Sequence, residues 1–168
     1  MFREMRRINQ QLPENEAIEI LASATHGILA VSGDGGYPYA VPLSFVYSGG
    51  KIYFHCAREG HKLDAIKRCP KVSFCVVSED VVIPEGYTTH YRSVIAFGSA
   101  RVIENNDEKL RAIELLAKKY HPTDSADGRR AEIDGAFGRF VMVEIEIEHL
   151  SGKEAKELMN ERKHKERT

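Results

Sequence analysis

Residues Tyr39–Val77 read YAVPLSFVYSGGKIYFHCAREGHKLDAIKRCPKVSFCVV, and their pattern predicts strand, turn, strand, polar loop, short helix and strand. The glycine pair Gly49-Gly50 separates two alternating apolar runs, residues 40–47 and 52–55. Glycine adopts positive φ at little cost, so a pair of glycines between two such runs indicates a tight β-hairpin.

A basic loop, Arg58-Glu59-Gly60-His61-Lys62, follows the second strand of the hairpin. A glycine, cationic side chains and the start of a helix can together bind a phosphate, because free N–H groups and positive charges point the same way. Ordinary surface charges ahead of a helix would give the same pattern. The loop alone leaves both interpretations open.

The length and charge of the chain limit what it can be. Its 168 residues suit one domain, which we assign to residues 1–152, with a charged tail from 153 to 168 that we expect to fray. Lys and Arg number 24 against 25 Asp and Glu, so the net charge of -1 predicts neither a nucleic-acid nor a membrane partner.

The cellular setting is predicted from two further features. The N-terminal residues lack the apolar core of a signal peptide and no run approaches the ~20 apolar residues of a membrane span, so we expect a cytoplasmic protein. The three cysteines, Cys56, Cys69 and Cys75, show no CxxC spacing. This favours reduced thiols over a disulfide framework or a metal site.

The chain before the hairpin predicts a helix and a strand. Pro13 and the acidic residues after it begin a helix, and Gly27–Val31 is a short apolar strand followed by a glycine-rich turn at residues 32–36. The next strand begins at Tyr37 and contains Pro38 and Pro42. Proline cannot donate to a β-ladder, so this strand should be bulged, bent or at a sheet edge.

The chain after residue 77 predicts mostly strands. Val81–Pro84 should end a strand, with a loop through His90, and residues 91–103 should form a long strand bent at Gly98. A capped helix at 108–120 and an alternating strand at 140–150, with Glu144 on its solvent side, follow. Between them, residues 122–128 should form a polar loop, and the chain from there to Gly138 has no clear pattern. Six or seven strands joined mostly by short turns predict a mainly β fold, a small antiparallel barrel with flanking helices.

Several residues could carry chemistry. His55 could contact a ligand or transfer a proton near neutral pH, although a structural histidine fits equally well. Cys56 could be a nucleophile, but a buried inert thiol is commoner. Ser44, on the proline-bent strand, and Tyr91-Arg92-Ser93, at the start of the long strand, could meet a planar ligand or a second subunit, or simply face solvent.

In order and spacing, these segments resemble the FMN-binding split-barrel proteins related to pyridoxamine 5′-phosphate oxidase, in the nitroimidazole-resistance (nitroimidazole reductase-like) branch. The resemblance covers residues 5–153. It rests on the segments Met5-Arg6-Arg7, Tyr39–Phe45, Ile52–His55 with Gly60-His61-Lys62, Val72-Ser73-Phe74, Tyr91–Val94 with Phe97-Gly98, and Ser151-Gly152-Lys153.

The resemblance implies a split barrel that binds FMN at the interface of a homodimer. By position it assigns to the cofactor the ring contacts Val41, Pro42, Leu43 and Ser44, the ribityl and ring-edge contacts His55, Cys56 and Ala57, the phosphate contacts His61 and Lys62, and Tyr91, Arg92 and Ser93 from a neighbouring strand or the partner subunit. His55 becomes the candidate catalytic residue. At the position of His61 the family frequently has arginine, and at the position of Cys56 it usually has a smaller residue.

Two functions follow from the resemblance. The first is an FMN-dependent oxidoreductase that reduces a small nitroaromatic or quinone-like electron acceptor. Its electron donor stays open, with a reduced nicotinamide as one candidate. The second is a binding or sensing protein that holds flavin or haem without turnover. FAD or haem in place of FMN stays open. A pyridoxamine phosphate oxidase activity is disfavoured, because the expected substrate-binding arginine and histidine pattern is missing near the C-terminus.

Overall fold

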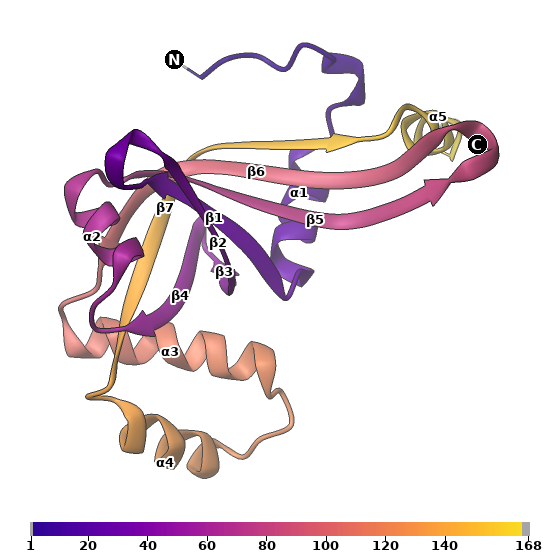
Figure 1. The fold of residues 1–168 in the computed structure, drawn as a ribbon. Helices are drawn as coiled ribbons and strands as arrows, with labels where there is room; N and C mark the ends of the chain where they lie inside the picture. Colours follow the sequence, from indigo (N-terminus) through magenta and orange to yellow (C-terminus); the bar gives the residue numbers. More distant parts are fainter. Residues whose placement is uncertain (1, 166–168) are drawn as a thin grey trace.

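The computed structural model describes residues 2–165 and contains one seven-stranded antiparallel sheet with flanking helices (Figure 1). The strands follow the spatial order β2-β1-β5-β6-β7-β4-β3. Their bounds are β1 His26–Ser32, β2 Pro38–Ser44, β3 Val46–Ser48, β4 Lys51–Ala57, β5 Lys71–Ile83, β6 Thr88–Val102 and β7 Phe140–Glu154. The mainly β, seven-stranded antiparallel split-barrel prediction is confirmed.

The sheet curls because one bent segment forms both of its edges. β2 pairs with β1, and β3, which follows after Phe45, pairs with β4 at the other end of the sheet. Phe45 is fully buried at the bend and lies in edge contact with Phe74, with ring centroids 4.8 Å apart. Pro38 and Pro42 therefore lie in an edge strand, as predicted, where the missing N–H costs no ladder bond.

Two predicted glycine features are confirmed. Ser48 pairs with Lys51 across the β3–β4 turn, where Gly49 and Gly50 have φ of 58° and 78°. The register of β6 against β7 shifts between Phe97 and Gly98. A Cβ at Gly98 would lie 2.2 Å from the Glu146 carbonyl oxygen, so only glycine allows the two backbones to approach this closely.

Helices close the barrel on three sides. α1 (Glu14–Ser23) packs against β6 and β7, and α2 (His61–Arg68) packs against β1 and β6 and buries the side chains of Leu63, Ala65 and Ile66. α3 (Asn106–Tyr120) covers β3, β4 and β7 and begins at Asn105, whose side chain accepts the Glu108 N–H. The predicted cap and packing face of α3 are thus confirmed.

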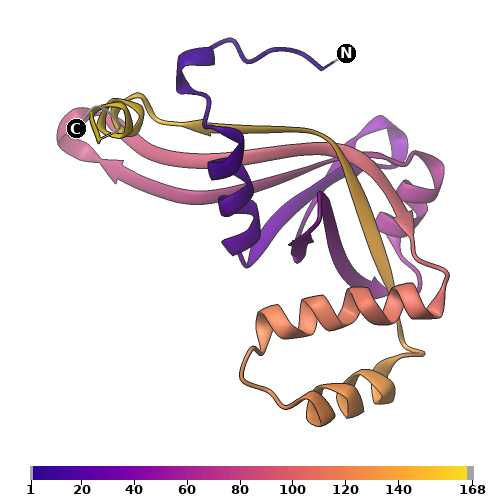
Figure 2. The ribbon, with the colours of Figure 1, turned by 180° about the vertical axis from the view of Figure 1, so that it is seen from behind.

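One helix was missed in the segment that had no clear pattern. α4 (Ala126–Ala136) lies beside α3 (Figure 2), and the Ser125 side chain caps it by accepting the Gly128 N–H. Only Ile133 of α4 is buried. A single apolar contact gives no helical periodicity, which explains why the sequence pattern did not reveal the helix.

Two predictions were wrong: the extent of the loop between β5 and β6, and the point from which the C-terminal segment frays. β5 ends at Ile83, as predicted, but β6 already begins at Thr88, so a long hairpin arm projects from the barrel where a loop through His90 was expected (Figure 1). Fraying from Lys153 is also wrong for the described residues, because β7 extends to Glu154 and α5 (Lys156–Lys165) follows beside the arm. Residues 166–168 of the predicted tail lie outside the described part. Within residues 2–165, no helix combines the length and apolarity that crossing a bilayer requires.

Candidate functional site

The outer face of β2 offers a shallow exposed surface. Pro42 and Ser44 are exposed, whereas the side chains of Val41 and Leu43 are half-buried and pack against the core. This alternation follows from the pleat of the strand. Of the four predicted ring contacts, Pro42 and Ser44 can therefore meet a planar ligand through side chains, and Val41 and Leu43 through the backbone.

Strand β4 places His55 on the outside of the barrel and Cys56 toward its interior. His55 is accessible to solvent and touches Phe140 edge-on, with ring centroids 6.0 Å apart. Burial among neighbouring atoms lowers the pKa of His55, so its imidazole is neutral at pH 7. Burial raises the pKa of the Cys56 thiol, with a smaller opposing effect of the Lys62 charge. Cys56 is thus a protonated thiol, not an activated nucleophile.

The first turn of α2 is the best anion-binding feature of the predicted set. Its N-cap is Gly60, at φ 135°, which has no side chain to cap the helix. The Leu63 and Asp64 N–H groups bond to the Gly60 carbonyl, but no backbone acceptor among residues 2–165 takes the N–H of His61 or Lys62. Lys62 also forms no ion pair within that described range. Free N–H groups and an unpaired ammonium fit a phosphate monoester.

His61 points from the same turn toward the β1–β2 turn. Its ring stacks on Tyr39, with centroids 4.2 Å apart and planes 14° from parallel. Its Nε2 lies 3.5 Å from a carboxylate oxygen of Asp34, whose other oxygen is 2.9 Å from Arg68. Its contacts with Tyr39 and Asp34 therefore hold the His61 ring at the rim of the α2 turn.

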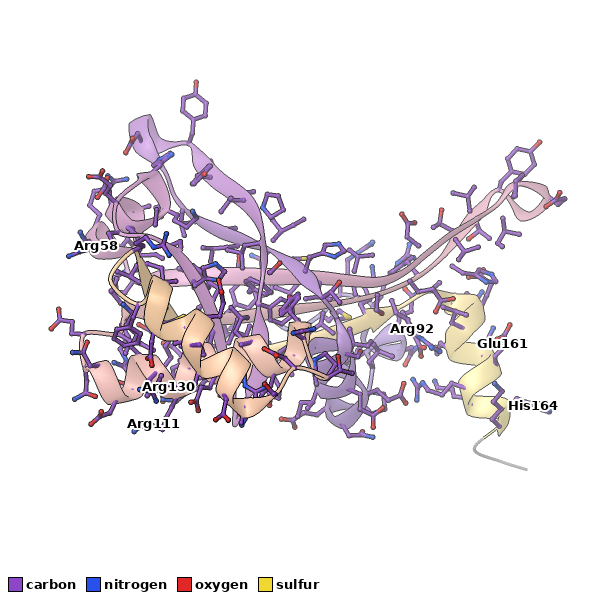
Figure 3. All side chains as sticks on the ribbon, turned by 90° about the horizontal axis from the view of Figure 1, so that it is seen from below. Arg58, Arg92, Arg111, Arg130, Glu161 and His164 are labelled. Atoms are coloured by element: carbon purple, nitrogen blue, oxygen red, sulfur yellow. The ribbon has the colours of Figure 1, made fainter. Side chains whose placement is uncertain are left out.

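Tyr91, Arg92 and Ser93 lie at the base of the hairpin arm, apart from the other predicted residues. Arg92 (Figure 3) has its Nε 3.5 Å from the fully buried carboxylate of Glu154. Another of its nitrogens is 3.8 Å from Glu79. Ser93 pairs with Val77 in β5, whereas Ser44 pairs with His26 in β1. Three strand spacings of about 4.8 Å thus separate Ser93 from the Ser44 edge within one protomer.

The outer sheet face between these two groups is unusually apolar. Pro42, Ile28, Cys75 and Ile95 form one cross-strand row from β2 to β6, and Ile28 and Ile95 are 41% and 39% exposed. Beside this row, Phe2 stacks on His149 with ring centroids 4.7 Å apart and borders a cavity of about 460 Å³. Such a row of exposed aliphatic side chains is typical of an interaction surface.

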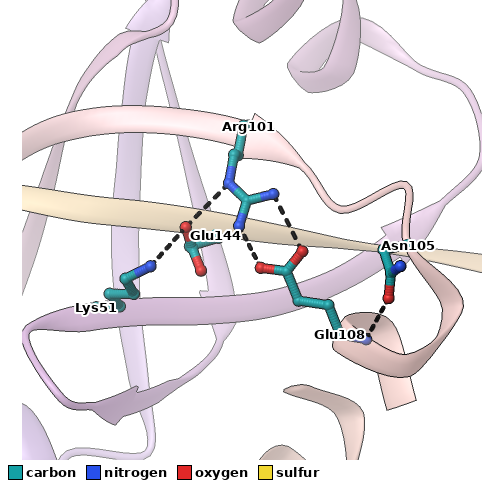
Figure 4. Close-up of polar contacts among 5 residues, drawn as sticks. All are labelled: Lys51, Arg101, Asn105, Glu108 and Glu144. Carbon is teal, nitrogen blue, oxygen red and sulfur yellow. Dashed lines mark hydrogen bonds and ion pairs between the residues drawn. The ribbon is translucent and has the colours of Figure 1, made fainter. Parts of the chain in front are cut away.

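Sequence reasoning missed a charged cluster on the other side of the barrel. Glu144 was predicted on the solvent side of β7, but it is only 3% exposed and lies 3.0 Å from both Lys51 Nζ and Arg101 Nε (Figure 4). Arg101 also bonds to Glu108 at the start of α3. Burial, followed by the charge and hydrogen bond of Glu144, raises the pKa of Tyr53 to about 12. The alternation of apolar and acidic residues along β7 could not show that α3 packs over the face that carries Glu144.

Residues 2–165 contain no group of three or more His, Cys, Asp or Glu side chains arranged to hold a metal ion. The residues at the α2 turn and on β2 do fit a phosphorylated planar cofactor, by the free N–H groups, the unpaired Lys62 and the exposed strand face described above.

Comparison with known proteins places these features in context. The family model for pyridoxamine 5′-phosphate oxidase matches residues 13–154. No curated protein matches the chain. Among solved structures, a candidate 5-nitroimidazole antibiotic resistance protein from Bacteroides thetaiotaomicron is similar at a TM-score of 0.70 and 19% identity, covering 85% of each chain.

Two further structures are similar over most of the chain. An FAD-binding protein from Mesorhizobium loti has a TM-score of 0.65 and 25% identity, over 87% of this chain and 97% of that one. An FAD- and haem-binding protein from Mycobacterium smegmatis has a TM-score of 0.72 and 21% identity, over 88% and 74% of the two chains.

Proposed function

The chain belongs to the pyridoxamine 5′-phosphate oxidase family, and from that premise we propose that it is a flavin-dependent oxidoreductase. The observation that carries the proposal is the uncapped first turn of α2 with the unpaired Lys62, at the rim of the exposed β2 face. The turn binds the flavin phosphate and the strand face supports the ring. The bound flavin supplies hydride or electron transfer.

The proposed reaction reduces a small nitroaromatic or quinone-like acceptor with electrons from a reduced nicotinamide. The likeness to the Bacteroides protein, named for 5-nitroimidazole resistance, supports this acceptor class. His55 is the side chain that could move a proton to the reduced acceptor. Because its pKa is lowered, its imidazole is mostly neutral at pH 7, so it must take up a proton from water before it can pass one to the acceptor.

The proposed site is completed by a second copy of the chain. Tyr91–Ser93 cannot reach the Ser44 edge within one protomer, because two strands lie between them. In a homodimer with the cofactor at the interface, the partner supplies these residues, and the exposed row with Ile28 and Ile95 is covered.

The proposal is tested first by the absorption spectrum of the untreated protein and by titration of the apoprotein with FMN. We expect flavin bands, or saturable quenching of flavin fluorescence. Lys62→Ala should weaken FMN binding about 10- to 150-fold, since a charge-assisted phosphate contact contributes about 1.5–3 kcal/mol. A colourless protein that FMN does not saturate would overturn the proposal.

A second measurement distinguishes an enzyme that turns over from a protein that only binds its cofactor. A non-catalytic flavin- or haem-binding protein is the rival, favoured by His55 having no carboxylate ion pair among the described residues. We expect steady consumption of reduced nicotinamide with a nitroaromatic acceptor, and a slower rate in His55→Gln with unchanged flavin binding. No consumption with any acceptor would favour the rival, and an unchanged rate in the variant would remove His55 from the mechanism.

A further inference from the structure

A second cavity opens at the far end of β4, next to the α2 turn. It has a volume of about 410 Å³, within the ~300–1,000 Å³ range of small-molecule sites. Arg58, the first residue after β4, lines it together with Lys109 of α3. The rings of Phe137, which follows α4, and Phe140, the first residue of β7, complete this part of the lining. Arg58 is two residues from Gly60, so the cavity adjoins the proposed phosphate site.

The cavity holds two cations that no carboxylate neutralises. Arg58 donates to the Gly138 carbonyl at 3.3 Å, and Lys109 Nζ donates to the Phe137 and Phe140 carbonyls at 2.6 and 2.8 Å. Neither forms an ion pair in the described residues. Glu104 is the one carboxylate on the lining, and it is exposed.

The two cations also act on each other. Burial and then the positive charge of Arg58 lower the pKa of Lys109. Two like charges that line one cavity repel each other, and an anion bound between them would relieve the repulsion. The Lys109 ammonium lies 4.2 and 4.4 Å from the Phe137 and Phe140 ring centroids. These cation–π contacts fix its position at the cavity wall.

The walls of the cavity add apolar surface to these charges. The Phe137 and Phe140 rings are half-buried, 6.0 Å apart and nearly perpendicular. An occupant that matches the site therefore combines a phosphate with a flat aromatic group. Arg58 lies only four residues before Lys62, so an occupant bound at Arg58 would extend toward the α2 turn.

We propose that this cavity binds the adenylate end of a dinucleotide flavin, with Arg58 on the second phosphate and the two phenylalanines beside the base. The inference rests on the proposed function and deepens it, since it makes FAD the preferred cofactor over FMN. The α2 turn and Lys62 then hold the phosphate that FMN and FAD share, and the Arg58 cavity holds the part that only FAD has.

The test compares the dissociation constants of FMN and FAD for the same apoprotein by flavin fluorescence. We expect the wild type to bind FAD about tenfold more tightly than FMN, and Arg58→Gln to remove most of that preference while changing FMN binding less than about twofold. Arg58→Lys should keep part of it. The matched control is Arg111→Gln, an exposed arginine on the outside of α3 that should leave both constants unchanged (Figure 3).

The outcomes distinguish the two proposals. If FMN binds and FAD binds no better, or if Arg58→Gln weakens both flavins equally, the adenylate site is wrong and the flavin site stands. If neither flavin binds, the proposed function fails and the inference fails with it. Arg58 is exposed and makes a single backbone bond, so its replacement should leave the fold intact, which circular dichroism checks.

Discussion

Glu144 shows how one buried carboxylate joins three elements. It lies on β7 between Lys51 of β4 and Arg101 of β6, and Arg101 reaches on to Glu108 of α3 (Figure 4). Burial alone would raise the pKa of Glu144, but the hydrogen bonds from Lys51 and Arg101 outweigh it and the pKa is lowered. The charged form is therefore stabilised in the folded state.

We predict that Glu144→Gln lowers the free energy of unfolding at pH 7 by about 1–3 kcal/mol, because two cations lose a buried partner. The folded pKa lies below the ordinary 4.5, so this contribution is complete above pH 4.5 and is lost as the pH falls through the folded value. Urea denaturation of both proteins should show the difference narrowing below pH 4.5.

The control for this prediction is Glu148→Gln, whose partner Lys71 is 66% exposed. It should change the free energy of unfolding little, since exposed ion pairs contribute about 0–1 kcal/mol. A difference between Glu144→Gln and wild type that stays constant from pH 7 down to acid unfolding would contradict the assignment of the lowered pKa to Glu144.

At the scale of single elements, the close approach of β6 and β7 depends on Gly98. We predict that Gly98→Ala destabilises the protein by more than about 2 kcal/mol, because the new methyl group would lie 2.2 Å from the Glu146 carbonyl oxygen and the bulge would have to shift. Gly135→Ala is the matched control. It adds a methyl with no atom within 4 Å inside α4, so it should stabilise by up to about 1 kcal/mol. Thermal unfolding of both variants measures the contrast, and equal shifts would show that crowding at Gly98 is not the cause.

The packing of α5 against the rest of the protein depends on the ion pair between Arg162 and Glu154. The charged composition of this C-terminal segment gave no indication of that pair. Arg162 bonds to the fully buried Glu154 through Nε at 2.9 Å and through a terminal nitrogen at 2.8 Å. We predict that Arg162→Met lowers the free energy of unfolding by about 3 kcal/mol, since Glu154 keeps only the 3.5 Å contact with Arg92. Lys163→Met, at an exposed position of the same helix, should stay within about 0.5 kcal/mol in the same denaturation experiment. An effect of Arg162→Met no larger than that of Lys163→Met would mean that this ion pair does not hold α5.

Local patterns predicted the elements whose packing repeats along the chain. The Gly49-Gly50 turn, the Gly98 bulge, the Asn105 cap and the apolar face of α3 each leave a signature within a few residues. The hairpin arm, α4 and α5 do not, because polar or isolated apolar residues give no period. The arm and α5 are ordered by long-range contacts, such as the Ala155 N–H to the Tyr91 carbonyl at 2.9 Å.

At the scale of the whole molecule, one part of the candidate site could be predicted from local sequence and another part could not. The loop sequence was enough to indicate Lys62 and the α2 turn as a phosphate site. The Arg58 cavity was not predictable, because Lys109 and the two phenylalanines come from segments about 50 and 80 residues farther along the chain. Only the return of β7 beside β4, where Ala57 pairs with Phe140, brings them together.

The exposed sheet face gives the last prediction, because a homodimer must cover it. Ile95 is 39% exposed at the β6 end of the row formed with Ile28 and Cys75, and the net charge of -1 produces little repulsion between copies. We predict that the wild type sediments as a dimer and that Ile95→Lys sediments as a monomer, since a buried unpaired ammonium opposes association.

Leu115→Lys is the control for this prediction, because Leu115 is 36% exposed on α3, away from the row, and the same substitution there should leave the dimer intact. The monomeric Ile95→Lys protein should also bind flavin more weakly than wild type, because Tyr91–Ser93 of the second copy no longer reach the Ser44 edge. A variant that is monomeric yet binds flavin as tightly as wild type would show that one protomer holds the whole site. A wild type that sediments as a monomer would instead leave the exposed row without the partner proposed for it.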